Sequence, residues 1–163
     1  MTDQRSGETA TSDTAVSDAD SNAVGVVDGR LSRTVIPSHY DVLIDTDLEA
    51  GTFDGTVTIA CDIVSATNQI TLHSLVATIE SATIVVDGGS QDAAISESAE
   101  TETVTLTTVS TLPPGAASIQ IVFSSGLSGE LLGYYKSTYT DADGNVRTIA
   151  CTQMEAPHAR RAF

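Results

Sequence analysis

Thr52-Phe53-Asp54-Gly55-Thr56-Val57-Thr58-Ile59-Ala60-Cys61-Asp62-Ile63 is the stretch of sequence that decides the fold. From Phe53 to Ile63, every second position is apolar or glycine, and most of the positions between them are Asp or Thr. Successive side chains of a β-strand point to opposite faces of the sheet. The alternation therefore predicts a strand with one solvated face and one buried face, and it places Cys61 in the core.

The same alternation recurs on both sides of this strand. In the preceding run, which starts after Pro37, Tyr40, Val42 and Ile44 share one face. Further strands are predicted at residues 68–72, 77–86, 102–109, 118–123, 134–140 and 146–153. Residues 91–99 are acidic and weakly patterned, and no strand is predicted there.

The last two predicted strands are joined by a short connection that contains Gly144. A connection of this kind is typical of an antiparallel hairpin. Pro157 then opens an Ala- and Arg-rich segment, which favours the start of a helix there. About eight short strands without an amphipathic helix predict an all-β fold, specifically an antiparallel β-sandwich of two packed sheets.

Length and composition allow one domain. A chain of 163 residues with 40% hydrophobic content can form a single modest core. Residues 1–29 are polar and acidic, so they bury too little apolar area to offset the entropy of ordering them. We therefore expect a disordered acidic lead-in at residues 1–29 and one domain at residues 30–163.

The charge of the chain excludes several partners. A net charge of -15 would repel phosphate backbones, so nucleic acid is not expected as a partner. No apolar run approaches the roughly 18 residues of a membrane span, and the N-terminus lacks the blocks of a signal peptide. We expect a cytoplasmic protein without a membrane span.

Cys61 and Cys151 are too few for a disulfide framework and are expected to be free, buried thiols.

Catalytic motifs are absent from the sequence. His39, His73 and His158 are scattered, without the His-Glu-x-x-His spacing that places two zinc ligands on one helix face. No glycine-rich phosphate loop and no nucleophile elbow occur either. We therefore predict no metal site and no catalytic residue within this chain.

One cluster near the C-terminus has the character of a binding site. Gln153 and Glu155 are two positions apart, so in an extended chain their side chains lie on the same side. An amide beside a carboxylate can hold the free ammonium group of a peptide. From spacing alone, however, an acid before Pro157 is more often a helix cap or dipole partner. By the same reasoning, Arg160 and Arg161 are more often in structural ion pairs.

Several short motifs resemble, in their order, the N-terminal β-domain of the aminopeptidase N family of zinc metallopeptidases. They are Pro37-x-x-Tyr40, Phe53-x-Gly55-x-Val57, Leu72-His73, Gly133-x-Tyr135-x-Ser137-x-Tyr139 and Thr152-Gln153-x-Glu155-x-x-x-Ala159-Arg160-Arg161-Ala162-Phe163. The resemblance covers about residues 31–163. The early motifs are weak singly, whereas the terminal one is specific.

The resemblance implies a saddle-like β-sandwich whose last strand and loop reach the active site of an adjoining thermolysin-like catalytic domain. It implies that Gln153 and Glu155 line the pocket for the first residue of a peptide substrate, and that Glu155 helps to hold the free α-amino group. Zinc is the cofactor of full-length members, whose Gly-x-Met-Glu-Asn and His-Glu-x-x-His motifs do not occur here. We therefore expect an N-terminal substrate-recognition domain or fragment, without its catalytic domain, that neither binds catalytic zinc nor cleaves peptides alone.

An alternative remains open at this stage. A stand-alone β-sandwich can keep the fold of an enzyme domain without its chemistry, because function depends on the site and not on the fold. Such a module would bind a protein or saccharide partner without catalysis.

Overall fold

Two stacked antiparallel sheets form the body of the protein in the computed structural model, which describes residues 26–27 and 30–162. One sheet has the strand order β3-β4-β10-β6-β7, and the other has the order β5-β9-β8. All pairings between these strands are antiparallel. The predicted all-β sandwich is confirmed, whereas the predicted lead-in lies outside the described residues, apart from Val26 and Val27.

The strands of the five-stranded sheet are β3 (Val35–Asp47), β4 (Thr52–Ile63), β6 (Thr78–Val86), β7 (Gly89–Asp92) and β10 (Gly115–Gly126). Those of the three-stranded sheet are β5 (Thr67–His73), β8 (Ala94–Ser98) and β9 (Thr103–Leu112). Two two-stranded pairs complete the fold: β1 (Val26–Val27) with β2 (Arg30–Leu31), and β11 (Gly133–Thr140) with β12 (Val146–Gln153). The described part of the chain contains no helix that could span a lipid bilayer.

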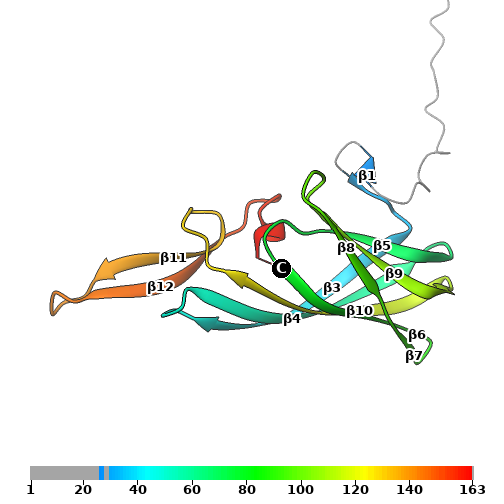
Figure 1. The fold of residues 1–163 in the computed structure, drawn as a ribbon, viewed down its shortest axis with the longest axis horizontal. Coiled ribbons are helices and arrows are strands. Elements are labelled where there is room, and N and C mark those ends of the chain that lie inside the picture. Colours follow the sequence, from blue (N-terminus) through cyan, green and yellow to red (C-terminus); the bar gives the residue numbers. More distant parts are fainter. Residues whose placement is uncertain (1–25, 28–29, 163) are drawn as a thin grey trace, which may run out of the picture.

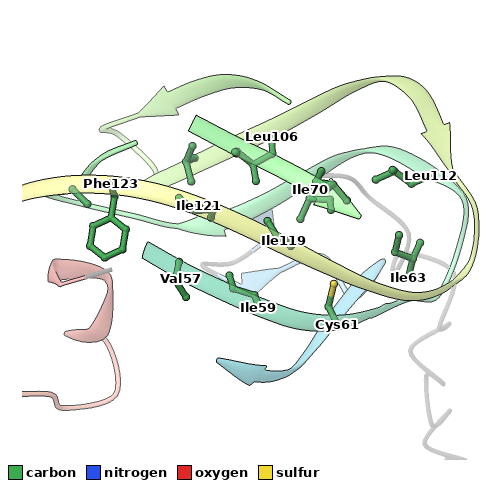
Figure 2. Packing of buried hydrophobic residues seen from close by; sticks show 14 of the residues in the cluster. Val57, Ile59, Cys61, Ile63, Ile70, Leu106, Leu112, Ile119, Ile121 and Phe123 are labelled. Carbon is green, nitrogen blue, oxygen red and sulfur yellow. The ribbon is translucent and has the colours of Figure 1, made fainter. Parts of the chain in front are cut away.

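The core lies between the two sheets, and the inward residues of β4 and β10 form one side of it (Figure 2). The inward residues of β4 are Phe53, Gly55, Val57, Ile59, Cys61 and Ile63, and all six are buried. Those of β10 are Ile119, Ile121 and Phe123, as the alternation predicts. The opposite sheet contributes Ile70, Val104 and Leu106. The predicted inward faces are therefore confirmed.

Gly55 has a packing role within the alternation of β4. It lies directly opposite Phe123 in the β4–β10 ladder, and a Cβ added at Gly55 would lie 2.3 Å from Cζ of Phe123. That distance is far below van der Waals contact, so only glycine leaves room for the ring. The end of the Phe123 ring can consequently reach over Gly55, and the residue stays fully buried.

Two regions differ from the sequence-based expectation. Residues 91–99, for which no strand was expected, contribute to β7 and form β8, and their side chains are exposed or half-buried. With no buried face, such edge strands lack the alternation that would reveal them. The helix expected from Pro157 is a single 3-10 turn, η2 (Ala159–Arg161), which begins two residues later.

The predicted hairpin is confirmed as β11–β12, with every position from Gly133 to Thr140 paired. It projects from one end of the sandwich as a separate ribbon, drawn in orange in Figure 1. Tyr134 joins its base to the sandwich, because its ring packs edge-on against Phe53 at 5.0 Å between centroids. Its hydroxyl also shares a 2.7 Å hydrogen bond with the hydroxyl of Thr46. These contacts at the base of the hairpin thereby fix where β12 ends.

Candidate functional site at the end of the hairpin

Gln153 and Glu155 lie where β12 ends and the chain turns towards η2. Gln153 is the last residue of the strand, and Glu155 follows in the short irregular segment before the turn. Both side chains are exposed. No hydrogen bond or ion pair within the described ranges occupies the amide of Gln153 or the carboxylate of Glu155. The two polar groups are thus available to a ligand.

The commoner local role of Glu155, a helix cap, is not observed. The residue at the N-cap of η2 is His158, and no side chain caps this turn. Glu155 takes part through its backbone instead, since its carbonyl accepts a 2.7 Å hydrogen bond from the amide of His158. The carboxylate therefore has no structural role in starting the turn.

The turn that follows Glu155 is docked against the sandwich at several points. Arg160 Nη1 lies 3.0 Å from Glu102 Oε2, which confirms the ion pair expected for this arginine. Ala162 is fully buried. Arg161 makes no ion pair with another described residue, and its Cβ instead packs over Gly133. The terminal segment is consequently held by the sandwich on one side and by the hairpin on the other.

Gly133 is required at this contact for two reasons. Its φ of +69° lies in the left-handed region, which residues other than glycine rarely adopt. A Cβ added there would also lie 2.6 Å from Cβ of Arg161 and 3.1 Å from its carbonyl oxygen. Gly133 of one sequence motif and Arg161 of another are therefore in close contact.

An apolar cavity of about 450 Å³ lies beside the terminal segment, between the two sheets. Its walls include Leu72, Ile121 and Phe123, and Ala159 and Arg160 close it on the side of η2. A second cavity of about 270 Å³ continues from it, as Leu31, Tyr40, Ile59 and Leu72 line both. The terminal segment thus covers one mouth of the space between the sheets.

His73 lines the larger cavity next to Arg160. Burial lowers the pKa of His73, and the neighbouring Arg160 guanidinium lowers it further, while Glu102 acts in the opposite direction. Its Nδ1 is buried and has no hydrogen-bond partner among the described residues. A neutral imidazole is therefore favoured beside the Arg160–Glu102 pair.

The described residues do not fit a metal ion. No three His, Cys, Asp or Glu residues in the described ranges are grouped so that they could hold one. His39 lies on an exposed position of β3, His73 ends β5, and His158 precedes η2. Cys61 and Cys151 are free thiols as expected, although Cys151 is only half-buried. Burial raises the pKa of the Cys61 thiol, with a smaller contribution from Asp62.

Sequence reasoning missed one residue at this site, Glu102. It was read only as the start of a strand, whereas its side chain pairs with an arginine 58 positions further along the chain. A contact over that separation leaves no periodic signal in a single sequence. The ion-pair role of Arg160 was expected, but its partner was not.

The chain is similar to known proteins over most of its length. The family described as Peptidase M1 N-terminal domain matches residues 36–163. The chain is 32% identical to Aminopeptidase M1 of Arabidopsis thaliana over 139 residues, which are 82% of this chain and 16% of that protein. It is 34% identical to Endoplasmic reticulum aminopeptidase 1 of Homo sapiens over 139 residues, or 82% of this chain and 15% of that protein.

A bacterial relative shows a similar identity to this chain. The chain is 32% identical over 135 residues to Aminopeptidase N of Acetobacter pasteurianus, covering 83% of this chain and 37% of that protein. The chain therefore spans only a small part of the relatives that it matches. The family match extends over most of the described sandwich and includes the whole terminal segment. This chain belongs to the family of N-terminal domains of M1 aminopeptidases.

Proposed function

We propose that this chain, with its domain at residues 30–163, is the substrate-recognition part of a zinc metalloaminopeptidase that removes residues from the N-termini of peptides. The observation that carries the proposal is the pair Gln153 and Glu155, polar, exposed and unoccupied at the end of β12. The family match to a peptidase domain supports the same assignment. In this proposal the carboxylate of Glu155 binds the free α-amino group of the peptide, and the amide of Gln153 completes the contact.

Electrostatics make Glu155 the stronger of the two contacts. A carboxylate about 4 Å from an ammonium gains about 4 kcal/mol at an effective dielectric constant near 20. Part of this gain is lost because both ions must leave water. A peptide with a blocked amino terminus would incur the cost of covering Glu155 without any compensating charge. The site would thereby select free N-termini.

The position of the pair also supports a role in choosing the cleaved bond. Gln153 and Glu155 are attached to a strand that is paired along its whole length and docked through Tyr134. A fixed site for the ammonium group sets a fixed distance to the first peptide carbonyl, so that one residue is removed at a time. The described residues offer no place for the zinc ion, which in this proposal is held by a separate catalytic domain. There the ion would supply the activated water for hydrolysis.

The proposal predicts that residues 1–163 are inactive alone. Purified chain, with and without added zinc, is mixed with leucine p-nitroanilide, and release of p-nitroaniline is followed by absorbance. No turnover above buffer is expected, because recognition residues alone provide neither an activated nucleophile nor a stabiliser for the developing oxyanion. Zinc-dependent turnover that survives repurification would show that the chain carries its own catalytic site, and the assignment would then be wrong.

A further inference from the structure

Two motifs that the proposed function leaves unexplained meet beside the terminal segment. Leu72-His73 ends β5, and Ala159-Arg160 lies in η2, yet Leu72, His73, Ala159 and Arg160 line the same cavity. Arg160 pairs there with Glu102, whose neighbour Thr103 is opposite His73 in the β5–β9 ladder. Residues from three distant parts of the chain therefore converge on one contact.

The backbone after β5 binds both members of this ion pair. The amide of Ser74 donates to the carbonyl of Glu102 at 2.9 Å, and the next amide, Leu75, donates to the carbonyl of Arg160 at 2.9 Å. Two consecutive amides thus hold the backbones of two residues whose side chains are themselves joined. This arrangement fixes η2 against the three-stranded sheet independently of the hairpin.

Glu102 is the last residue of the turn between β8 and β9. Its φ is +52°, in the left-handed region, although it is not a glycine. Glycine or asparagine adopts this conformation at lower cost. Asp87, in the turn before Gly88, has the same backbone conformation. Both positions lie in turns between strands, so the conformation follows from the turn, and what sets Glu102 apart is its ion pair with Arg160.

A short series of hydrogen bonds connects this contact to Glu155. The carbonyl of Glu155 accepts from the amide of His158 at 2.7 Å, and the carbonyl of His158 accepts from the amide of Arg161 at 3.0 Å. Displacement of η2 would therefore move the backbone of Glu155. The hairpin holds the segment at Gln153, where β12 ends, and also touches η2 through the contact of Gly133 with Arg161.

We infer that Arg160 and Glu102, together with the amides of Ser74 and Leu75, form a clamp that positions Glu155 for the α-amino group of a peptide. Arg160 and Glu102 are positioning residues in this inference, because they act through the backbone of Glu155. The part that concerns peptide binding rests on the proposed function, whereas the mechanical part concerns the described residues alone.

Hydrogen exchange of the full 163-residue chain, followed by mass spectrometry, tests the mechanical part. Arg160→Ala and Glu102→Gly are each expected to raise exchange about threefold to tenfold at Leu75 and at residues 156–162, because each change removes a half-exposed ion pair. Exchange in β4 and β10 should stay at the wild-type rate. Arg160→Lys should restore part of the protection because it keeps the charge.

Two features separate a clamp from a general loss of stability. Glu102→Gly relieves the left-handed backbone, so its melting temperature should equal or exceed that of the wild type while the terminal segment exchanges faster. Arg147→Ala is the matched control, since it breaks the 2.8 Å ion pair with Asp141 at the far end of the hairpin. It should leave residues 156–162 unaffected. Wild-type exchange of these residues in Arg160→Ala would overturn the inference.

The link to peptide binding has its own readout in the full-length protein that contains this chain. There, Glu102→Gly should lower kcat/KM by about the factor by which exchange rises, because the disordered segment must be ordered on binding. If kcat/KM is unchanged although Glu155→Ala lowers it, the clamp does not position Glu155. If Glu155→Ala has no effect, the proposed function fails, and the exchange result alone decides the clamp.

Discussion

Replacing Phe53 by Ala is expected to lower the free energy of unfolding by about 3–5 kcal/mol, the usual cost of removing a fully buried aromatic ring. Phe53 is 1% exposed and packs edge-on against Phe123, at 6.4 Å between ring centroids, as well as against Tyr134. Truncation therefore leaves a cavity in the sandwich and removes the contact that docks the hairpin. Urea denaturation followed by circular dichroism measures the loss.

The location of the damage distinguishes this effect from an unspecific one. Val109→Ala is the control, because Val109 is 98% exposed and its truncation should change stability by less than about 0.5 kcal/mol. Phe53→Ala should also increase hydrogen exchange in β11 and β12 more than in β8, as only the hairpin depends on the contact with Tyr134. A loss below about 1 kcal/mol would mean that the ring is not a central part of the core.

Replacing Glu155 by Ala in the full-length protein is expected to lower kcat/KM for an amino-acid arylamide about 30-fold to 1,000-fold. The factor corresponds to about 2–4 kcal/mol, the range found when one member of a desolvated charge pair is removed. Glu155 is exposed in this chain and has no ion-pair partner in the described ranges, so its removal should leave the fold intact. Steady-state kinetics, with the melting temperature as a check on folding, measure the effect.

Glu130→Ala provides the matched control for the charge itself. Glu130 is also an exposed acid, and it lies before β11, on the loop that leads into the hairpin. Its loss changes the net charge equally but should alter kcat/KM less than about twofold, because an exposed charge that makes no contact with the peptide is screened by solvent and salt. Glu155→Gln should behave like Glu155→Ala if charge is what matters. Wild-type kinetics in both Glu155 variants would remove the assigned role.

The central strands of the sandwich were predictable because burial alternates along them. In β4 the inward positions from Phe53 to Ile63 are buried and most of the outward ones are exposed, so a single sequence contains the pattern. β7 and β8 have no fully buried residue and leave no such pattern. The hairpin was predictable for a different reason, namely the Gly144 connection between two strand-like runs.

The terminal site was only partly predictable. Gln153 and Glu155 are close in sequence, so their types and spacing could be read directly, although spacing alone favoured a cap that is not observed. The contact of Gly133 with Arg161 and that of Glu102 with Arg160 join distant segments. Such contacts are set by the packing of the whole sandwich. They become visible only when the fold is known.

The surroundings of the candidate site differ in charge from the rest of this acidic chain. A net charge of -15 leaves few cations, and two of them, Arg160 and Arg161, lie in η2 beside the candidate site. Arg160 is engaged with Glu102. The carboxylate of Glu155, by contrast, has no cation among the described residues, which is the state expected of a group that binds an ammonium ion.

Sequencing the transcript beyond the codon for Phe163 tests the central claim most directly. If this chain is the recognition part of a zinc aminopeptidase, the reading frame should continue into a Pro-Cys-x-Asp-Glu-Pro segment and then into His-Glu-x-x-His with a more distant glutamate. A stop codon immediately after Phe163 in the mature transcript would contradict the account, and it would favour a β-sandwich that binds a partner without catalysis.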